Sequence, residues 1–176
     1  MPPGGERCVK PKRNALLVSL WRLWYRQRRR MPSKGGAMSH QHSLRVYYED
    51  TDLAGIVYYA NYLKFIERGR TEWVASLGID QMALKAVGGI VFAVRRIEAD
   101  FLRPARFGDD LVVETRLCSL GGARLVLDQA VLRGSERLFV AAVTVVCLTG
   151  DGHAARMPAD LKVRLAGASL LPLPQD

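Results

Sequence analysis

Apolar and polar residues follow a helical rhythm in one long stretch of the chain. From Tyr58 or Tyr59 to Leu77, apolar or small side chains recur at spacings of three and four residues on one face of a predicted helix: Tyr62, Ile66, Gly69, Trp73 and Leu77. Gly78 supplies the signal that ends this helix. A glycine inside a helix costs about 1 kcal/mol relative to alanine. We therefore expect the helix backbone at Gly69 to lie close against a sheet.

A strand pattern governs most of the remaining sequence. We expect a short strand at 44–48, a short helical or irregular piece at 80–87, long strands at 88–103, 111–120, 124–133 and 137–149, and a closing helix at 158–165. Short glycine-rich connections between the last three strands predict antiparallel hairpins. The stretch 138–148 is apolar on both faces, so we expect it to be central or at a subunit contact. Together these elements predict an α+β fold.

The charge of the chain is distributed very unevenly. Of the formal net charge of +9, residues 1–37 carry all of it, with ten Lys/Arg against Glu6 alone, whereas residues 38–176 are balanced. A neutral domain without a basic stripe argues against nucleic-acid binding. We expect one domain at 38–166, followed by a proline-rich tail at 167–176.

Residues 1–37 are expected to be a basic, largely disordered extension. Its apolar run at 15–21 is too short to span a membrane and is closed by arginines. Two interpretations remain: a basic amphipathic helix that touches a membrane surface, or an upstream extension from a misassigned start, with Met38 as the natural beginning. We favour the second. No small-residue cleavage site follows the run, which disfavours a signal peptide, and we expect a cytoplasmic protein.

Cysteine and histidine residues offer little chemistry. Cys8, Cys118 and Cys147 have no paired spacing, so a zinc ribbon is excluded and a disulfide framework is improbable. The three histidines lie far along the sequence from the acidic residues described next. We therefore expect no metal and no redox cofactor.

The stretch 47–62, YYEDTDLAGIVYYANY, concentrates the residues that can do chemistry. Gly55 permits a tight or left-handed turn at which a ligand carbonyl can approach the main chain. The helix that follows presents unpaired N–H groups at its positive end. A carboxylate facing such amides suits attack on an acyl carbonyl. An acid ahead of a helix is more often only a cap or turn residue, about two times in three.

The same stretch resembles a known family. The run from Asp52 to Tyr62, DLAGIVYYANY, is similar to the signature of the 4-hydroxybenzoyl-CoA thioesterase family of hotdog-fold proteins, and Tyr48–Asp52, YEDTD, resembles the Tol-Pal-associated acyl-CoA thioesterases. The resemblance covers about 43–165. It implies a hotdog fold, in which an antiparallel sheet wraps a long helix, and a homo-oligomer, commonly a dimer of dimers, with active sites between subunits.

The resemblance also implies roles for individual residues. Asp52 would be the catalytic carboxylate, as base or nucleophile, and the backbone N–H of Tyr59 would polarise the thioester oxygen. Tyr48 would shape the pocket or hold the carboxylate, and an ordinary core aromatic is an equal alternative. The substrate would contact Tyr48, Gly55, Ile56, Val57 and Tyr58. Tyr59 stands where the Tol-Pal branch often has histidine, so the acyl group stays open.

The leading interpretation is an acyl-CoA thioesterase that releases a free acid and coenzyme A. Hotdog dehydratases pair a histidine with an acid, and this motif has no histidine. A thioesterase group with a glutamate in the long helix is a further rival, but surface salt bridging explains Glu67 and Glu72 better. The non-enzyme alternative is an envelope-associated scaffold or an acyl-carrier-protein-binding protein. A weak association with membrane or acyl carrier protein is left open.

Overall fold

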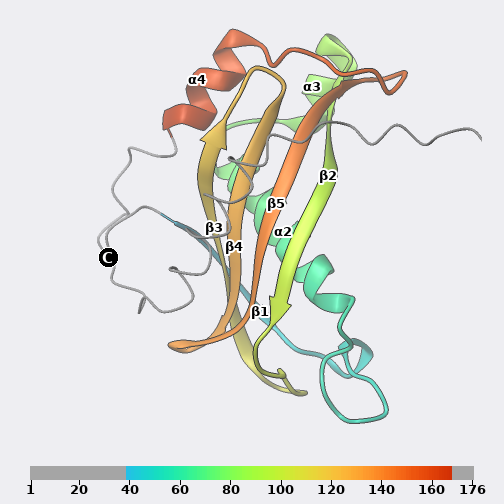
Figure 1. The fold of residues 1–176 in the computed structure, drawn as a ribbon, viewed down its shortest axis with the longest axis vertical. Helices are drawn as coiled ribbons and strands as arrows, with labels where there is room; N and C mark the ends of the chain where they lie inside the picture. The colour runs from blue at the N-terminus through green and yellow to red at the C-terminus, as the bar shows by residue number, and fades with distance from the viewer. Residues whose placement is uncertain (1–38, 168–176) are drawn as a thin grey trace, which may run out of the picture. The chain divides into compact units, whose positions relative to one another are not determined.

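The computed structural model describes residues 39–167. The basic extension expected at 1–37, and all but the first residue of the tail expected at 167–176, lie outside this range. The described chain runs through β1 (His40–Arg45), the 3₁₀ helix η1 (Tyr48–Asp50), α2 (Asn61–Ser76), α3 (Gln81–Gly88), β2 (Ile90–Phe101), β3 (Asp110–Leu120), β4 (Arg124–Arg133), β5 (Glu136–Thr149) and α4 (Ala159–Gly167) (Figure 1).

The strands form one antiparallel sheet in the order β1-β3-β4-β5-β2. The long helix α2 runs along one face of this sheet (Figure 1). β5 lies between β4 and β2, which confirms the central position predicted from its two apolar faces. β1 and β2 are the edge strands. The expected α+β architecture, a helix wrapped by an antiparallel sheet, is therefore confirmed.

The core lies between α2 and the facing side of the sheet. Each long strand turns every second side chain toward the helix, as its pleat requires. The helix contributes Phe65 and Ile66, both fully buried. The sheet contributes fully buried residues from three neighbouring strands: Val113, Leu127, Val131, Phe139 and Val143.

Two predicted boundaries differ from the structure. The strand expected at 44–48 is wrong in position: β1 begins at His40 and ends at Arg45. The chain leaves the β1–β3 ladder at Val46, whose N–H donates to Asp109 O at 2.9 Å, and then tightens into η1. The helix expected from Tyr58 or Tyr59 begins at Asn61 instead. The other predicted strands and both short helices are confirmed within a few residues.

Gly69 brings the α2 backbone against the sheet, as predicted. A Cβ atom at this position would lie 2.5 Å from Val113 Cγ1 and 3.1 Å from Val113 Cβ. Real Cβ atoms do not approach other atoms that closely, so either the helix or β3 would have to move.

We predict that Gly69→Ala lowers the melting temperature despite the better helix propensity of alanine. Overpacking costs about 1–3 kcal/mol, whereas the propensity gain is about 1 kcal/mol. Glu72→Ala, at an exposed position of the same helix, is the control without a clash. The double variant Gly69→Ala, Val113→Ala should recover part of the loss. A rise in the melting temperature of the single variant would contradict the close contact.

Within residues 39–167, no helix has both the length and the apolar character that crossing a membrane requires.

Candidate active site

The segment 51–58 closes into a turn beside the end of β2. Asp52 N donates to Ile56 O at 2.9 Å, and Gly55 N donates to Asp52 O at 2.9 Å. Gly55 has a φ of +70°, a left-handed conformation that other residues rarely adopt. Thr51 and Val57 form an antiparallel bridge at the base of the turn. The tight turn predicted around Gly55 is confirmed.

Asp52 is exposed on this turn. Its Oδ1 atom accepts a hydrogen bond from Ala54 N at 2.9 Å, so the interpretation as a turn residue holds for this oxygen. No donor within residues 39–167 forms a hydrogen bond with its Oδ2 atom. The carboxylate is therefore oriented by the backbone while one oxygen stays accessible to a substrate.

Asp50 is buried and has a structural role. Its carboxylate accepts a hydrogen bond from Tyr47 N at 2.9 Å. Its carbonyl accepts from Asn61 Nδ2 at 2.9 Å and from Tyr58 N at 2.8 Å. Because Asn61 is the first residue of α2 and is itself buried, these bonds attach the Asp52 turn to the start of the helix. Breaking such buried bonds costs about 1–3 kcal/mol, so Asp50 is an unsuitable neutral control for Asp52.

The amide of Tyr59 lies at the start of the helical turn. Asn61 N donates to Tyr58 O at 2.8 Å, which opens that turn, and Tyr59 and Ala60 lie between the two. In the described part of the chain, no acceptor forms a hydrogen bond with the Tyr59 N–H. This amide stands at the positive end of the α2 dipole, where it can donate to an oxygen that gains negative charge.

The segment 104–109 supports the turn from the sheet side. Val57 is buried and donates its N–H to Ala105 O at 2.9 Å. Ala105 N donates to the Tyr62 hydroxyl at 2.8 Å. Burial raises the pKa of Tyr62, and the Ala105 amide acts in the opposite direction. In the same segment, Asp109 forms an ion pair with Arg133, with 2.7 Å between Asp109 Oδ2 and Arg133 Nη1. The turn is thus hydrogen-bonded to Ala105, and Ala105 is in turn hydrogen-bonded to Tyr62 of α2.

Exposed aromatic rings surround the turn. Tyr48 is 82% exposed, so its interpretation as a core aromatic is wrong. The rings of Tyr58 and Tyr59 lie 4.6 Å apart between centroids. A hydrogen bond with Tyr59 raises the pKa of Tyr58. Tyr59 also meets Phe101, the last residue of β2, at 6.3 Å. An apolar surface therefore runs from the turn to the end of this edge strand.

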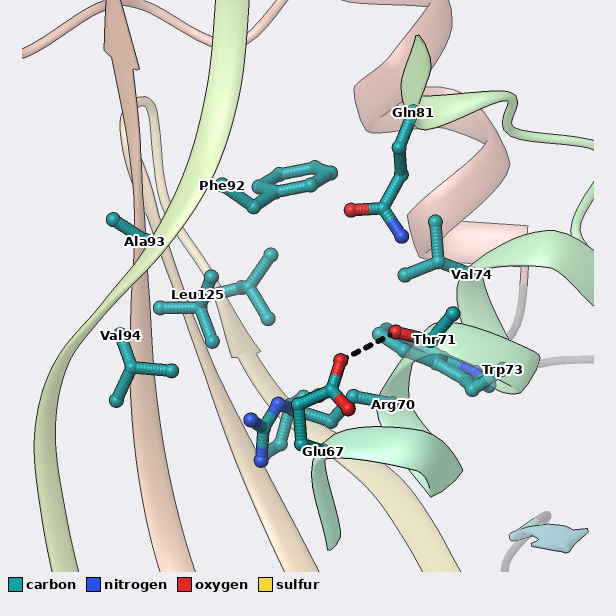
Figure 2. A pocket seen from close by; sticks show the side chains of 12 residues that line it. Glu67, Arg70, Thr71, Trp73, Val74, Gln81, Phe92, Ala93, Val94 and Leu125 are labelled. Carbon is teal, nitrogen blue, oxygen red and sulfur yellow. Dashed lines mark hydrogen bonds between the residues drawn. The ribbon is translucent and has the colours of Figure 1, made fainter. Parts of the chain in front are cut away.

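A pocket opens elsewhere along α2, between this helix, α3 and the sheet (Figure 2). Its empty volume, including the part open to solvent, is about 590 Å³. The lining includes Glu67 and Thr71 from α2, Gln81 from α3, Phe92 from β2, and Leu125 and Leu127 from β4. Glu67 follows Tyr59 by eight residues, about 12 Å along a helix axis. Within one chain, the pocket is therefore separate from the Asp52 turn. We call it the α2–β2 pocket.

Two polar pairs occupy the helix side of the α2–β2 pocket. Thr71 Oγ1 donates to Glu67 Oε1 at 2.9 Å (Figure 2). Arg70 donates from Nη1 to Gln129 Oε1 at 2.8 Å. Gln129 is fully buried on β4. Burial lowers the pKa of the Arg70 guanidinium, and the charge of Glu67 acts in the opposite direction.

The structure places the sequence-predicted site residues in two settings. Asp52, Gly55 and Tyr58 are exposed on or beside the turn, with the Tyr59 amide next to them, whereas Val57 is buried in the core. We find no ion pair of Glu67 or Glu72 within residues 39–167, although the sequence predicted surface salt bridges for these helix glutamates.

The pocket and the residues that anchor the turn were not predicted. Asn61 lies inside the recognised motif, yet its role depends on a contact across 11 positions. The pocket draws on two helices and three strands, so no local pattern could have revealed it. Within residues 39–167, no three His, Cys, Asp or Glu side chains gather to hold a metal ion.

Comparisons with known proteins show the family to which the chain belongs. The thioesterase superfamily model matches residues 54–140. The acyl-CoA thioesterase YbgC of Haemophilus influenzae is 39% identical over 105 residues, which are 60% of this chain and 77% of that protein. The acyl-CoA thioester hydrolase YbgC of Escherichia coli is 41% identical over 106 residues, 60% of this chain and 78% of that protein.

Solved structures share the fold. The crystal structure of a probable thioesterase from Bartonella henselae has a TM-score of 0.66 and 38% sequence identity, and the match covers 68% of this chain and 99% of that chain. The helix wrapped by five antiparallel strands is the hotdog fold. The chain therefore belongs to the thioesterase superfamily, as a homologue of the YbgC-type acyl-CoA thioesterases.

Proposed function

We propose that this protein hydrolyses an acyl-CoA thioester to a free acid and coenzyme A at the Asp52 turn. The observation that carries this proposal is the geometry of two successive turns: an accessible Asp52 oxygen on the first, and the unengaged N–H of Tyr59 on the second, at the start of α2. The names of the YbgC relatives support acyl-CoA as the substrate class. The Tyr48–Asp52 motif supports the Tol-Pal-associated branch, which we propose together with a cytoplasmic location.

The chemistry needs one carboxylate and one donor. As a general base, Asp52 takes a proton from water while the water oxygen bonds to the thioester carbon. The carbonyl oxygen becomes an oxyanion, and the Tyr59 N–H stabilises it. The C–S bond then breaks, and the thiolate of coenzyme A takes up the proton. As a nucleophile, Asp52 instead bonds to the acyl carbon, the C–S bond breaks, and the thiolate of coenzyme A leaves. Water then hydrolyses the resulting anhydride and supplies the proton that the thiolate takes up. Both routes give one acid and one thiol.

The residues around the turn suit the approach of the thioester. Gly55 offers main chain without a side chain, and Tyr58 offers an exposed ring. Tyr48 and Ile56 remain proposed contacts of the substrate. Val57 contributes through its backbone, because its side chain is 3% exposed.

We further propose that the protein forms a dimer through β2. This strand is 12 residues long and lies at a sheet edge, where its second row of backbone groups has no partner strand within residues 39–167. The opposite edge strand, β1, is 6 residues long and mostly polar. Phe101 is 53% exposed and Val94 is 45% exposed on β2. A second copy of β2 would cover these side chains and join the two sheets.

This dimer would unite the two halves of the site. A two-fold axis near the middle of β2 pairs the strands antiparallel, so the Phe101 end of one copy meets the Ile90 end of the other. Tyr59 lies at the Phe101 end, and Phe92 of the α2–β2 pocket lies at the Ile90 end. The turn of one copy would then face the pocket of its partner. Assembly of two dimers into a tetramer is a further expectation.

The test is turnover by the purified full chain. With butyryl-CoA as the probe, we expect saturable release of one thiol per acid. Release of neither product, with butyryl-CoA or with other acyl-CoA thioesters, would favour a non-catalytic scaffold over the enzyme.

A further inference from the structure

Asn61 places a buried side-chain amide in the first turn of α2. Its exposed fraction is 5%, and burying an amide is unfavourable unless it forms hydrogen bonds. An asparagine near a helix start usually caps the helix, with its side-chain oxygen accepting from a free N–H group. Here the N-cap is Ala60, which forms no side-chain bond, and Asn61 Nδ2 donates to Asp50 O at 2.9 Å. The buried amide therefore serves a contact outside the helix.

The backbone of Asn61 orients the amide of Tyr59. Asn61 N donates to Tyr58 O at 2.8 Å. The carbonyl of Tyr58 and the N–H of Tyr59 belong to one planar trans peptide unit, so they point in opposite directions. The bond that holds the Tyr58 carbonyl toward the helix therefore directs the Tyr59 N–H away from the body of the helix, where a ligand oxygen can reach it.

The side chain of Asn61 fixes the segment that carries Asp52. Asp50 O accepts two hydrogen bonds, from Asn61 Nδ2 at 2.9 Å and from Tyr58 N at 2.8 Å. A single residue, Thr51, separates this anchored carbonyl from Asp52, and its backbone is extended, with φ −100° and ψ 156°. The position of the Asp52 carboxylate relative to α2 therefore depends on the Asn61 amide.

On the basis of the proposed function, we propose that Asn61 is a positioning residue that sets the distance between the Asp52 carboxylate and the Tyr59 N–H. Its side chain holds the segment of the carboxylate, and its backbone holds the peptide of the donor. Because Asn61 is buried, it acts through these two groups rather than on the substrate. Loss of the side-chain bond frees the carboxylate to move, whereas the backbone bond keeps the donor in place.

Two variants of the full chain test this role, with butyryl-CoA as the probe. Asn61→Asp keeps the shape of the side chain, but an ionised carboxylate cannot donate and places an oxygen against Asp50 O. Asn61→Ala removes the group. A misplacement of about 1 Å can slow a reaction by about 10²-fold, so we expect a loss of this size in kcat for both variants, with KM nearly unchanged. An Asn61→Asp variant with the kcat of the wild type would show that the side chain only fills space, and the inference would be wrong.

Leu165→Ala is the control for loss of stability. Leu165 is fully buried on α4, which contacts the far end of α2, where Arg164 Nη1 donates to Gly78 O at 2.7 Å (Figure 1). We expect this control to lower the melting temperature and to leave kcat unchanged. If it lowered kcat as far as an Asn61 variant of equal melting temperature, the loss would report stability, and the inference would fail. Asn61→Ala decides alone if Asn61→Asp does not fold.

The double variant Asn61→Ala, Asp52→Asn separates positioning from a general effect on the fold. If Asn61 acts through the Asp52 carboxylate, removing its side chain matters little once that carboxylate is gone. The double variant should then be about as slow as Asp52→Asn alone. Losses that multiply would mean that Asn61 acts independently of Asp52, which overturns the inference. A wild type without any turnover overturns the proposed function, whereas an active wild type matched by both Asn61 variants overturns this inference alone.

Discussion

Asp52→Asn is expected to reduce kcat by about 10²–10⁴-fold, the usual loss when a general base is removed. Asparagine keeps the volume of aspartate and retains an oxygen for the Ala54 N–H, so the turn should persist. The loss should appear in kcat and in kcat/KM together, because the carboxylate acts in the transition state. Steady-state kinetics and the melting temperature of the same preparation measure both effects.

The control for Asp52→Asn is Glu49→Gln. Glu49 is exposed three residues before Asp52, so its change alters the local charge without touching the turn. Asp50→Asn would confuse stability with chemistry, because Asp50 is buried and receives the Tyr47 N–H. If Asp52→Asn lowered only the melting temperature, Asp52 would be a turn residue. If Glu49→Gln were inactive, the assignment of the catalytic carboxylate to Asp52 would be wrong.

Ala99→Pro is expected to convert the proposed dimer into monomers and to abolish most turnover. Leu102 N donates to Leu138 O at 2.8 Å, so Phe101 and Phe139 form a non-hydrogen-bonded pair of the β2–β5 ladder. Alternation along the ladder makes Ala99 and Ala141 a pair of the same kind. The N–H of Ala99 therefore points away from β5, toward the open edge. Proline removes this N–H and leaves the β2–β5 hydrogen bonds in place.

Sedimentation equilibrium at micromolar concentration measures the assembly of Ala99→Pro. Ala99→Val is the control, because it adds a side chain and keeps the N–H. If one site combines the Asp52 turn of one copy with the α2–β2 pocket of the other, loss of the dimer should also lower turnover. A proline variant that stays dimeric would place the interface elsewhere. A monomer with full activity would show that one chain holds the whole site.

Much of the fold was predictable because its signals are local. The three- and four-residue spacing on α2 and the glycine-rich turns before β4 and β5 each concern neighbouring residues. Gly69 revealed a close contact, although its partner Val113 could not be named from sequence. The start of α2 was misjudged because 58–60 already turns like a helix before the regular hydrogen bonds begin.

The site was predictable only in part. Asp52 and the Tyr59 amide came from one continuous motif, and the structure places them on adjoining turns. Tyr48 was ambiguous because an aromatic residue near a strand packs inward or outward depending on how the chain bends. Helical spacing placed Glu67 on the polar side of α2, and the structure shows that it also lines the α2–β2 pocket. That spacing carries no information about the opening that α3 and β2 leave beside the helix.

The central claim is that the Asp52 carboxylate drives cleavage of the thioester, and a single-turnover measurement tests it most directly. With enzyme in excess over butyryl-CoA, rapid quenching gives the rate constant of C–S cleavage apart from product release. We predict that Asp52→Asn lowers this rate constant by about 10²–10⁴-fold and leaves the Kd for butyryl-CoA nearly unchanged. An unchanged rate constant for cleavage in a folded Asp52→Asn variant would contradict the account.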